Sequence, residues 1–297
     1  MSGHPHIRRE SDAGSHIGRI VIARPEASNA VSIEMVGALR DAFAAFAADD
    51  AIKVILLSAE GADLTCGFDA SQLERMYKDA PGGSVRKLPS QRARLMAHDA
   101  LWWGPDGLYT RVLHCPKVTV LAARGLCLEI GLYLALCCDL VLADETARFG
   151  NPRWRHVGVD GDVSMLVAAV GLKRAKELLI FGAQWDAREA HARGLIDEVV
   201  APAELDSAAL KLAAFCTQVM RDGIAAEKHV VFASLAKMHI ATGFATATAV
   251  GAWASNVHFR PGEFNFLREA REQGLEAALA AAQRHCAPAN PVSLQHT

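Results

Sequence analysis

The chain has 297 residues, of which 51% are apolar and 22% charged, and its formal net charge is −2. A polypeptide of this length and composition buries a large core and has no bias towards disorder. The near-zero net charge lacks the basic surface that binding to a phosphate backbone requires, so nucleic acid is excluded as a main partner.

Membrane, secretion and metal signals are missing from the sequence. The longest apolar runs, such as LCLEIGLYLALCC (126–138), fall short of the roughly 18 residues that a membrane span needs. The first fifteen residues are polar and contain no apolar signal segment. The seven cysteines are an odd number without CxxC spacing, and apart from HPH (4–6) in the polar tail the histidines show no metal-ligand spacing. We therefore expect a cytoplasmic protein with reduced thiols, no metal and no membrane partner.

The first third of the chain predicts a polar tail followed by alternating strands and helices. The tail covers 1–15, and HIGRIVIAR (16–24) has the pattern of a strand. Ser32 is a natural N-cap for a helix over 32–50, whose apolar residues recur at helical spacing. The almost continuous apolar run at 52–60 predicts a strand that is buried on both faces.

The remainder continues this alternation and then becomes helical. We expect a long helix over about 90–113, a strand at 117–125, a helix at 129–139 and a strand at 139–150. A later helix is capped by Asp186 and ended by Gly194. The predicted organisation is thus an N-terminal tail, an α/β core and a C-terminal helical region, spanning 1–15, 16–205 and 206–297.

Two loop-to-helix junctions stand out as candidate sites. They are CGFD (66–69) and LEIG (128–131). Each presents free backbone N–H groups at the positive end of a helix dipole. Two such donors aimed at one point form an oxyanion hole, which stabilises the oxyanion formed from a thioester carbonyl.

Six segments occur in an order and at a spacing that resemble the enoyl-CoA hydratase/isomerase (crotonase) superfamily, over residues 16–205. They are RPEASNA (24–30), LTCGFD (64–69), PKVTVLAARGLCLEIG (116–131), CCDLVLADETARFGNP (137–152), GLKRAKELLIFG (171–182) and AREAHARGLIDEVV (187–200). The resemblance implies a spiral of ββα units with a C-terminal helical trimerisation region. It also implies a homotrimer or a dimer of trimers, and an acyl-CoA substrate. Coenzyme A is then part of the substrate, and no cofactor is bound permanently.

Carried over by motif position, the resemblance assigns the hole to the backbone N–H groups of Phe68 and Ile130. Residues at the matching family positions border the substrate, and in this chain they are Ala27, Ser28, Cys66, Asp69, Ala70 and Tyr133. Backbone donors survive a change of side chain, so phenylalanine and isoleucine at these positions are compatible with a hole.

The chain departs from the hydratase pattern at three places. Glu129-Ile130-Gly131 stands where the family pattern commonly has three glycines. Tyr133 and Arg153 stand where hydratases carry their two catalytic glutamates. Hydration by the paired-glutamate route therefore lacks both groups that position and activate water.

A carboxylate further along offers a replacement. Asp162 precedes the apolar run VSMLVAAVG, and its spacing from Trp154 and Gly158 resembles the 4-chlorobenzoyl-CoA dehalogenase branch, although Gly104 stands where that branch has a histidine base. Asp162 fits both a helix N-cap and a catalytic carboxylate, and one residue can serve as both.

Four further side chains keep more than one interpretation each. Glu129 is either a second catalytic carboxylate or a surface complement to the helix dipole. Tyr133 either faces the acyl group or packs in the core. Arg153 either pairs with an acid or binds an acidic acyl group, unless it is a plain surface arginine. His156 is either a general base or a satisfied histidine.

The sequence leaves three functional hypotheses. The first is acyl-CoA chemistry through an oxyanion-stabilised enolate, with proton transfer by Asp162 or Glu129, giving isomerase-like or specialised lyase chemistry. The second is hydrolysis, either aryl-CoA dehalogenation or C–C cleavage of a β-diketone. The third is a non-catalytic member that binds acyl-CoA.

Overall fold

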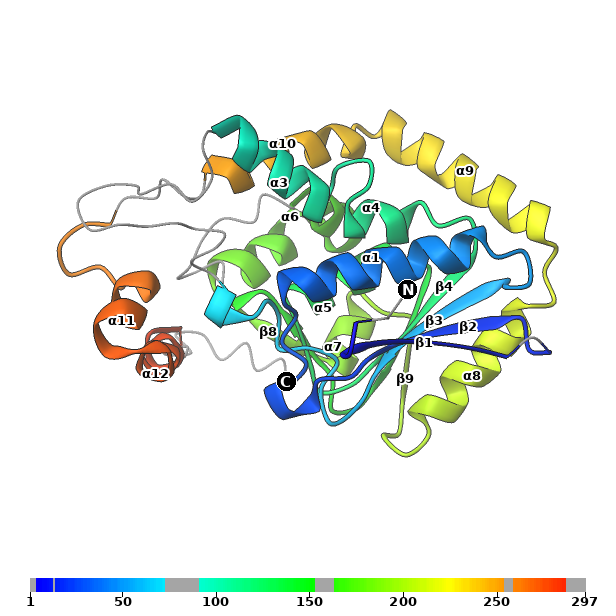
Figure 1. Cartoon of the computed structure of the whole chain (residues 1–297), viewed down its shortest axis with the longest axis horizontal. Helices are drawn as coiled ribbons and strands as arrows, with labels where there is room; N and C mark the ends of the chain where they lie inside the picture. The colour runs from blue at the N-terminus through cyan, green and yellow to red at the C-terminus, as the bar shows by residue number, and fades with distance from the viewer. Residues whose placement is uncertain (1–3, 13, 73–90, 153–162, 254–258, 287–297) are drawn as a thin grey trace.

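The computed structural model describes residues 4–12, 14–72, 91–152, 163–253 and 259–286, and a six-stranded sheet forms its centre (Figure 1). The strand order in this sheet is β1-β2-β3-β4-β6-β9. Strands β1 and β2 pair antiparallel, and every other neighbouring pair is parallel. The strands are β1 (Ile7–Asp12), β2 (Ile17–Ile22), β3 (Val54–Ala59), β4 (Val118–Ala123), β6 (Leu140–Asp144) and β9 (Glu198–Val200).

Both faces of the large sheet are buried, which explains the continuous apolar run predicted for β3. Successive side chains of a strand point to opposite faces. Ile55 and Leu57 therefore join the main core with helix α1 (Ile33–Ala48), and Val54 and Leu56 pack against α8 (Leu205–Cys216). Figure 1 shows these two helices on opposite sides of the sheet.

Residues 7–12, which the sequence placed in a polar tail, form the edge strand β1. The strand pairs with β2 from Ile7 opposite Ile22 to Asp12 opposite Ile17. Ile7 supplies a buried side chain, and the side chains of Arg8 and Glu10 form a salt bridge. Charged residues are typical of edge strands because they discourage further strand pairing. The polar composition that indicated a tail is thus the composition of a protected edge.

A second, three-stranded sheet has the order β5-β7-β8. Its strands are β5 (Leu126–Leu128), β7 (Arg148–Gly150) and β8 (Gln184–Asp186). The single strand predicted over 139–150 is therefore two strands in two sheets. The chain turns between them, where the Asp144 carboxylate accepts hydrogen bonds from the backbone N–H and the hydroxyl of Thr146. An Asx turn of this kind redirects a strand.

The helices of the core follow the sequence pattern except that one predicted helix is interrupted, and another helix is kinked at a glycine. The predicted helix over 90–113 is divided into α3 (Gln91–Leu101) and α4 (Leu108–Leu113), with two glycines and a proline between them. Helix α6 (Val163–Ile180) is kinked at Gly171, which has a φ of 79°. Helix α7 (Ala187–Ala192) has the predicted cap, because the Asp186 carboxylate accepts the N–H of Glu189 at 2.8 Å.

After β9 the described chain is helical, as predicted. Helix α8 is followed by α9 (Arg221–Lys237), α10 (Ile240–Trp253), α11 (Phe266–Gln273) and α12 (Leu275–Cys286). Figure 1 shows α11 and α12 together at the end of the molecule opposite α9. Within the described ranges no single helix is long and apolar enough to cross a membrane, and only the bent pair 221–237 and 242–250 meets the length and composition criteria jointly.

Candidate active site

Three segments that are distant in sequence meet at the ends of β3 and β5. They are the loop 24–32, which contains the short 3-10 helix η1 (Pro25–Ala27), the loop 64–69, and the junction between β5 and α5 (Ile130–Cys137). Thr65 N–H donates to the carbonyl of Leu126 at 2.8 Å, and Val31 N–H donates to the carbonyl of Gly67 at 2.9 Å. Backbone hydrogen bonds therefore fix the loop 64–69 between the other two segments.

Two buried polar residues that sequence reasoning missed support this loop. Asn29 is fully buried, and its side-chain amide donates to the carbonyls of Glu60 and Asp63 at 2.8 and 2.7 Å. The Thr65 hydroxyl donates to the carbonyl of Asn29 at 2.7 Å and accepts the N–H of Gly67 at 3.0 Å. The only sequence signal for these roles is a turn-prone asparagine in RPEASN, because the partners lie far along the chain.

The two predicted donor junctions are brought together by a side chain. The backbone N–H of Phe68 donates to the Oε2 atom of Glu129 at 3.0 Å. Ile130 is the first residue of α5, so its N–H has no carbonyl partner within its own helix. The Glu129 carboxylate thus lies at the Phe68 N–H of the first junction. The backbone of the same residue directly precedes α5 at the second junction.

Glu129 is not the exposed dipole partner that one interpretation of the sequence described. Glu129 is only 8% exposed, and its side chain makes no capping hydrogen bond to α5. Its backbone has φ 51° and ψ −103°, a region that side-chain-bearing L-residues rarely adopt. The contact with Phe68, together with the surrounding packing, holds a glutamate in a conformation natural for glycine.

Gly67 makes room for the carboxylate. It has a φ of 108°, and a Cβ atom built on it would lie 2.5 Å from Oε2 of Glu129. A side chain at position 67 would therefore collide with the carboxyl group. The glycine of LTCGFD is required both for its backbone conformation and for the close approach of Glu129.

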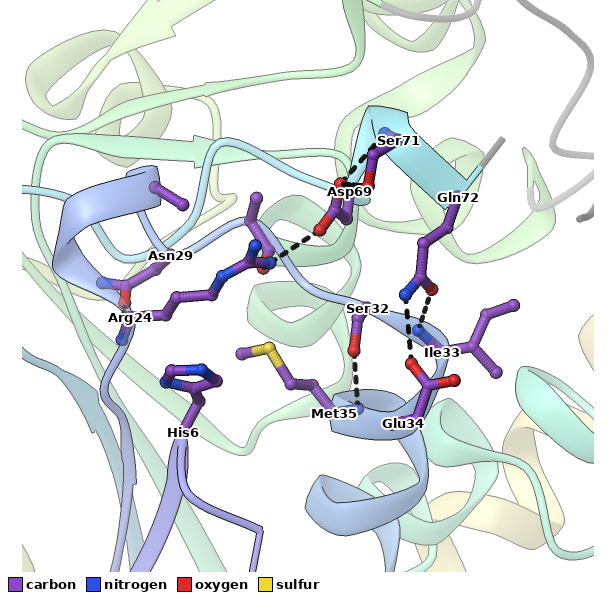
Figure 2. A network of polar contacts seen from close by, with 12 residues as sticks. His6, Arg24, Asn29, Ser32, Ile33, Glu34, Met35, Asp69, Ser71 and Gln72 are labelled. Atoms are coloured by element: carbon purple, nitrogen blue, oxygen red, sulfur yellow. Dashed lines mark hydrogen bonds and ion pairs between the residues drawn. The ribbon is translucent and has the colours of Figure 1, made fainter. Parts of the chain in front are cut away.

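An ion pair ties the first loop to the second, as Figure 2 shows. The Arg24 guanidinium donates to Asp69 Oδ2 at 2.7 Å and to the carbonyl of Ala30 at 3.0 Å. Asp69 Oδ1 accepts the N–H and the hydroxyl of Ser71 at 2.9 and 2.6 Å. Burial opposes ionisation of Asp69, but the hydrogen bonds from Ser71 and Arg24 outweigh it and hold the pKa of this carboxyl below its usual range.

The predicted substrate-bordering residues of the two loops lie together. Cys66 N–H donates to the carbonyl of Ser28 at 2.9 Å, and the Cys66 thiol lies 3.7 Å from the carbonyl oxygen of Ala27. Ala70 opens the short 3-10 helix η2 (Ala70–Gln72) directly after Asp69. All of these residues except the largely buried Asp69 are half-buried, and that exposure is consistent with a binding edge.

Tyr133 lies one turn after Glu129 on the buried helix α5. Its N–H donates to the carbonyl of Glu129 at 3.0 Å, and its ring centroid lies 5.5 Å from that of Tyr109. The Tyr109 ring stacks on Trp102, and the Trp102 ring packs edge-on against Phe68. One aromatic cluster therefore reaches from α5 to the donor residue Phe68. At 2% exposure Tyr133 is part of the core, and a role towards substrate stays a prediction.

Four other predicted residues cannot be placed. Arg153, Trp154, His156 and Asp162 lie outside the described residues. Among the residues that the structure describes, no group of three or more histidine, cysteine, aspartate or glutamate side chains is arranged to hold a metal ion. The described part of the site therefore consists of backbone donors, the buried carboxylates of Glu129 and Asp69, the Arg24 partner of Asp69 and an aromatic cluster.

Comparison with known proteins identifies the class to which this fold and site belong. Residues 12–273 match the enoyl-CoA hydratase/isomerase family, and the chain belongs to that family. A putative enoyl-CoA hydratase from Thermus thermophilus is 33% identical over 239 residues, which cover 80% of this chain and 88% of the relative. A 4-chlorobenzoyl coenzyme A dehalogenase from an Arthrobacter species is 29% identical over 209 residues, or 68% of each chain.

Solved structures confirm the crotonase fold that the sequence predicted. An enoyl-CoA hydratase/isomerase from Xanthobacter autotrophicus has a TM-score of 0.78 and 27% identity, covering 95% of this chain and 98% of the other. An enoyl-CoA hydratase from Mycobacterium smegmatis has a TM-score of 0.77, with 95% of each chain covered. At 23% identity the second similarity supports the fold alone.

Proposed function

We propose that this protein is an enzyme that acts on an acyl-CoA thioester through an enolate stabilised by the N–H groups of Phe68 and Ile130. One observation carries the proposal: the Phe68 N–H already donates to a carboxylate oxygen at 3.0 Å, so this donor is oriented towards an oxygen of the kind an enolate presents. Coenzyme A enters as part of the substrate, with no cofactor bound permanently.

The reaction that fits best is proton transfer rather than hydration by paired glutamates. A carboxylate base removes a proton from the carbon next to the thioester, the C–H electron pair forms the enolate double bond, and the carbonyl oxygen takes the negative charge. Return of the proton to a different carbon gives isomerase-like chemistry, and expulsion of a leaving group gives lyase chemistry. Asp162 and Glu129 are the candidate bases.

The reaction is tested by isotope uptake. Purified protein is incubated in D₂O and H₂¹⁸O with pooled 2-enoyl-CoA, 3-enoyl-CoA and aryl-CoA thioesters, beside the Asp162→Asn variant, and products are read by mass spectrometry. Deuterium uptake that falls in the variant is expected if Asp162 transfers the proton. Unchanged uptake in Asp162→Asn would exclude Asp162 as the base and leave Glu129 as the next candidate, to be tested with Glu129→Gln, and no uptake from any pool would contradict the proposal.

A second candidate function is hydrolytic dehalogenation of an aryl-CoA thioester, in which a ring halogen is replaced by a hydroxyl group. The Arthrobacter dehalogenase relative favours it, as does the spacing of Trp154 and Asp162, while Gly104 replaces the expected base. In the same screen it predicts ¹⁸O in the aryl product without deuterium exchange. A β-diketone hydrolase would turn over without coenzyme A, and a non-catalytic member would bind thioesters without incorporating either label.

We also propose a cytoplasmic homotrimer or dimer of trimers. Large apolar side chains are exposed on and beside α8 and α9, and they include Phe215, Met220, Val230 and Val231, at 56–75% exposure. Exposed apolar surface of this kind typically marks an interface. Light scattering on the eluting protein is expected to give three or six times the chain mass of 31.8 kDa, and a monomer mass would contradict this assembly.

A further inference from the structure

The proposed oxyanion donor already has an internal ligand. The carboxylate of Glu129 accepts the Phe68 N–H at 3.0 Å, and the residue is 8% exposed, so water does not readily replace this contact. The contact spans 61 positions along the chain. It is therefore a feature of the assembled site and not of local loop geometry.

The backbone of Glu129 indicates that this contact is maintained against strain. Its φ of 51° and ψ of −103° lie in a region where a side chain is disfavoured, and its carboxyl group fits only because Gly67 has no Cβ. Conformations of this kind persist where the surrounding structure enforces them, and they cluster at functional sites. A glycine at position 129 would adopt the same backbone without strain and would leave the donor open.

We propose that Glu129 is a specificity-determining residue whose carboxylate occupies the place of the substrate oxygen, so that a thioester binds at Phe68 by displacing it. This inference rests on the proposed function. A single N–H cannot donate at full strength to two oxygens, and the thioester carbonyl therefore competes with the carboxylate.

The competition selects for charge on the incoming oxygen. A neutral thioester carbonyl is a weaker acceptor than a carboxylate, so ground-state binding gains little from the Phe68 donor. An enolate oxygen carries a negative charge and competes with the carboxylate on equal terms. The wild-type site therefore discriminates against neutral carbonyls, and it favours ligands that present an oxyanion.

The test compares two coenzyme A compounds that differ only at the carbon bonded to sulfur, which is a carbonyl in one and a methylene in the other. One is a saturated acyl-CoA thioester, and the other is the S-alkyl-CoA thioether of the same length, which lacks the carbonyl oxygen. Their dissociation constants are measured by calorimetry on the wild type, Glu129→Gly and Glu129→Gln. Because both ligands share every other group, the ratio of their affinities reports the contacts of the carbonyl oxygen with its N–H donors, and the change in that ratio from wild type to Glu129→Gly reports release of the Phe68 donor.

We expect the wild type to bind the two compounds within about threefold of each other, because a donor held by the Glu129 carboxylate adds little to ground-state binding of a neutral carbonyl. In Glu129→Gly the thioester is expected to gain about tenfold to a hundredfold over the thioether, the range of a newly available hydrogen bond in a buried site. Glu129→Gln is expected to be intermediate, because the amide keeps an acceptor oxygen without the charge.

Two results would overturn the inference, and they differ from failure of the proposed function. Equal thioester-to-thioether ratios in the wild type and Glu129→Gly would show that the carboxylate does not compete. A strong thioester preference already present in the wild type would show that the donor is open. Failure of both compounds to bind any variant would instead refute the acyl-CoA proposal, and displacement with it.

A ligand-free measurement checks the position of the carboxylate. Gly67→Ala is expected to lower the urea midpoint more in the wild type than in Glu129→Gly, because its Cβ collides with Oε2 only when the glutamate is present. Gly171→Ala is the matched control, since Gly171 has a φ of 79° but nothing within 4 Å of an added Cβ. Equal midpoint shifts for Gly67→Ala in both backgrounds would place the carboxylate elsewhere and contradict the inference.

Discussion

Replacing Phe68 with proline is expected to lower turnover about 10²- to 10³-fold relative to Phe68→Ala, the usual effect of removing one oxyanion-hole donor. Proline has no backbone N–H, so the change deletes the atom that donates to Glu129. The neighbouring bridge to Val31 does not use this N–H, because it is formed by the carbonyl of Gly67 and the N–H of Asp69.

The alanine variant makes this comparison specific to the donor. Both substitutions remove the Phe68 ring, whose centroid lies 6.4 Å from that of Trp102, so both lose this aromatic contact, while the proline alone places its Cδ atom where the N–H met Glu129. Turnover is measured on the thioester identified by isotope uptake, and urea unfolding of each variant confirms that it is folded. Equal turnover in the two variants would refute a catalytic role for this N–H.

Asp69→Asn is expected to lower the free energy of unfolding by about 1.5–3 kcal/mol near neutral pH, the range for hydrogen bonds to a charged group. The variant keeps the size of the side chain but leaves the half-buried Arg24 guanidinium without its charge partner. Because this pair joins the loop 24–32 to the loop 64–69, loss of thioester affinity is expected to accompany the loss of stability.

The pH dependence of this effect follows from the direction of the shift. The pKa of Asp69 is depressed in the folded protein, so its ionised form is favoured by folding. The stabilisation is complete above the unfolded value of about 3.9, and it is lost as the pH falls through the lower folded pKa. The difference in stability between wild type and Asp69→Asn should therefore be constant near neutral pH and shrink below about pH 4.

An exposed ion pair provides the control for Asp69. Arg8 and Glu60 form a salt bridge with side chains 42% and 45% exposed, and Glu60→Gln is expected to change stability by less than about 1 kcal/mol. Urea titrations of the three proteins from neutral pH to pH 3 make the comparison. A loss in Asp69→Asn no larger than that in Glu60→Gln would contradict a structural role for the Arg24–Asp69 pair.

The sequence by itself determined the elements whose signals are local. The continuous apolar run of β3 reads as a strand because the strand is covered on both faces. Ser32 and Asp186 cap their helices as predicted, since an N-cap depends only on residues two or three positions away. The ordered motifs were enough to indicate the superfamily, because each motif fixes a backbone conformation near itself.

Only the tertiary structure decided what the site contains. Glu129 meets the Phe68 N–H across 61 positions, and Arg24 meets Asp69 across 45. Neither contact has a local signal, because each depends on how parallel strands align and on where their connecting loops emerge. The same reason explains why β1 was predicted to be part of a tail. Its polar residues have no strand signal of their own, and they form a strand by pairing with β2. A glutamate in place of a glycine indicates an altered hole, but its carboxylate could be placed on the donor only once the folded chain brought the two loops together.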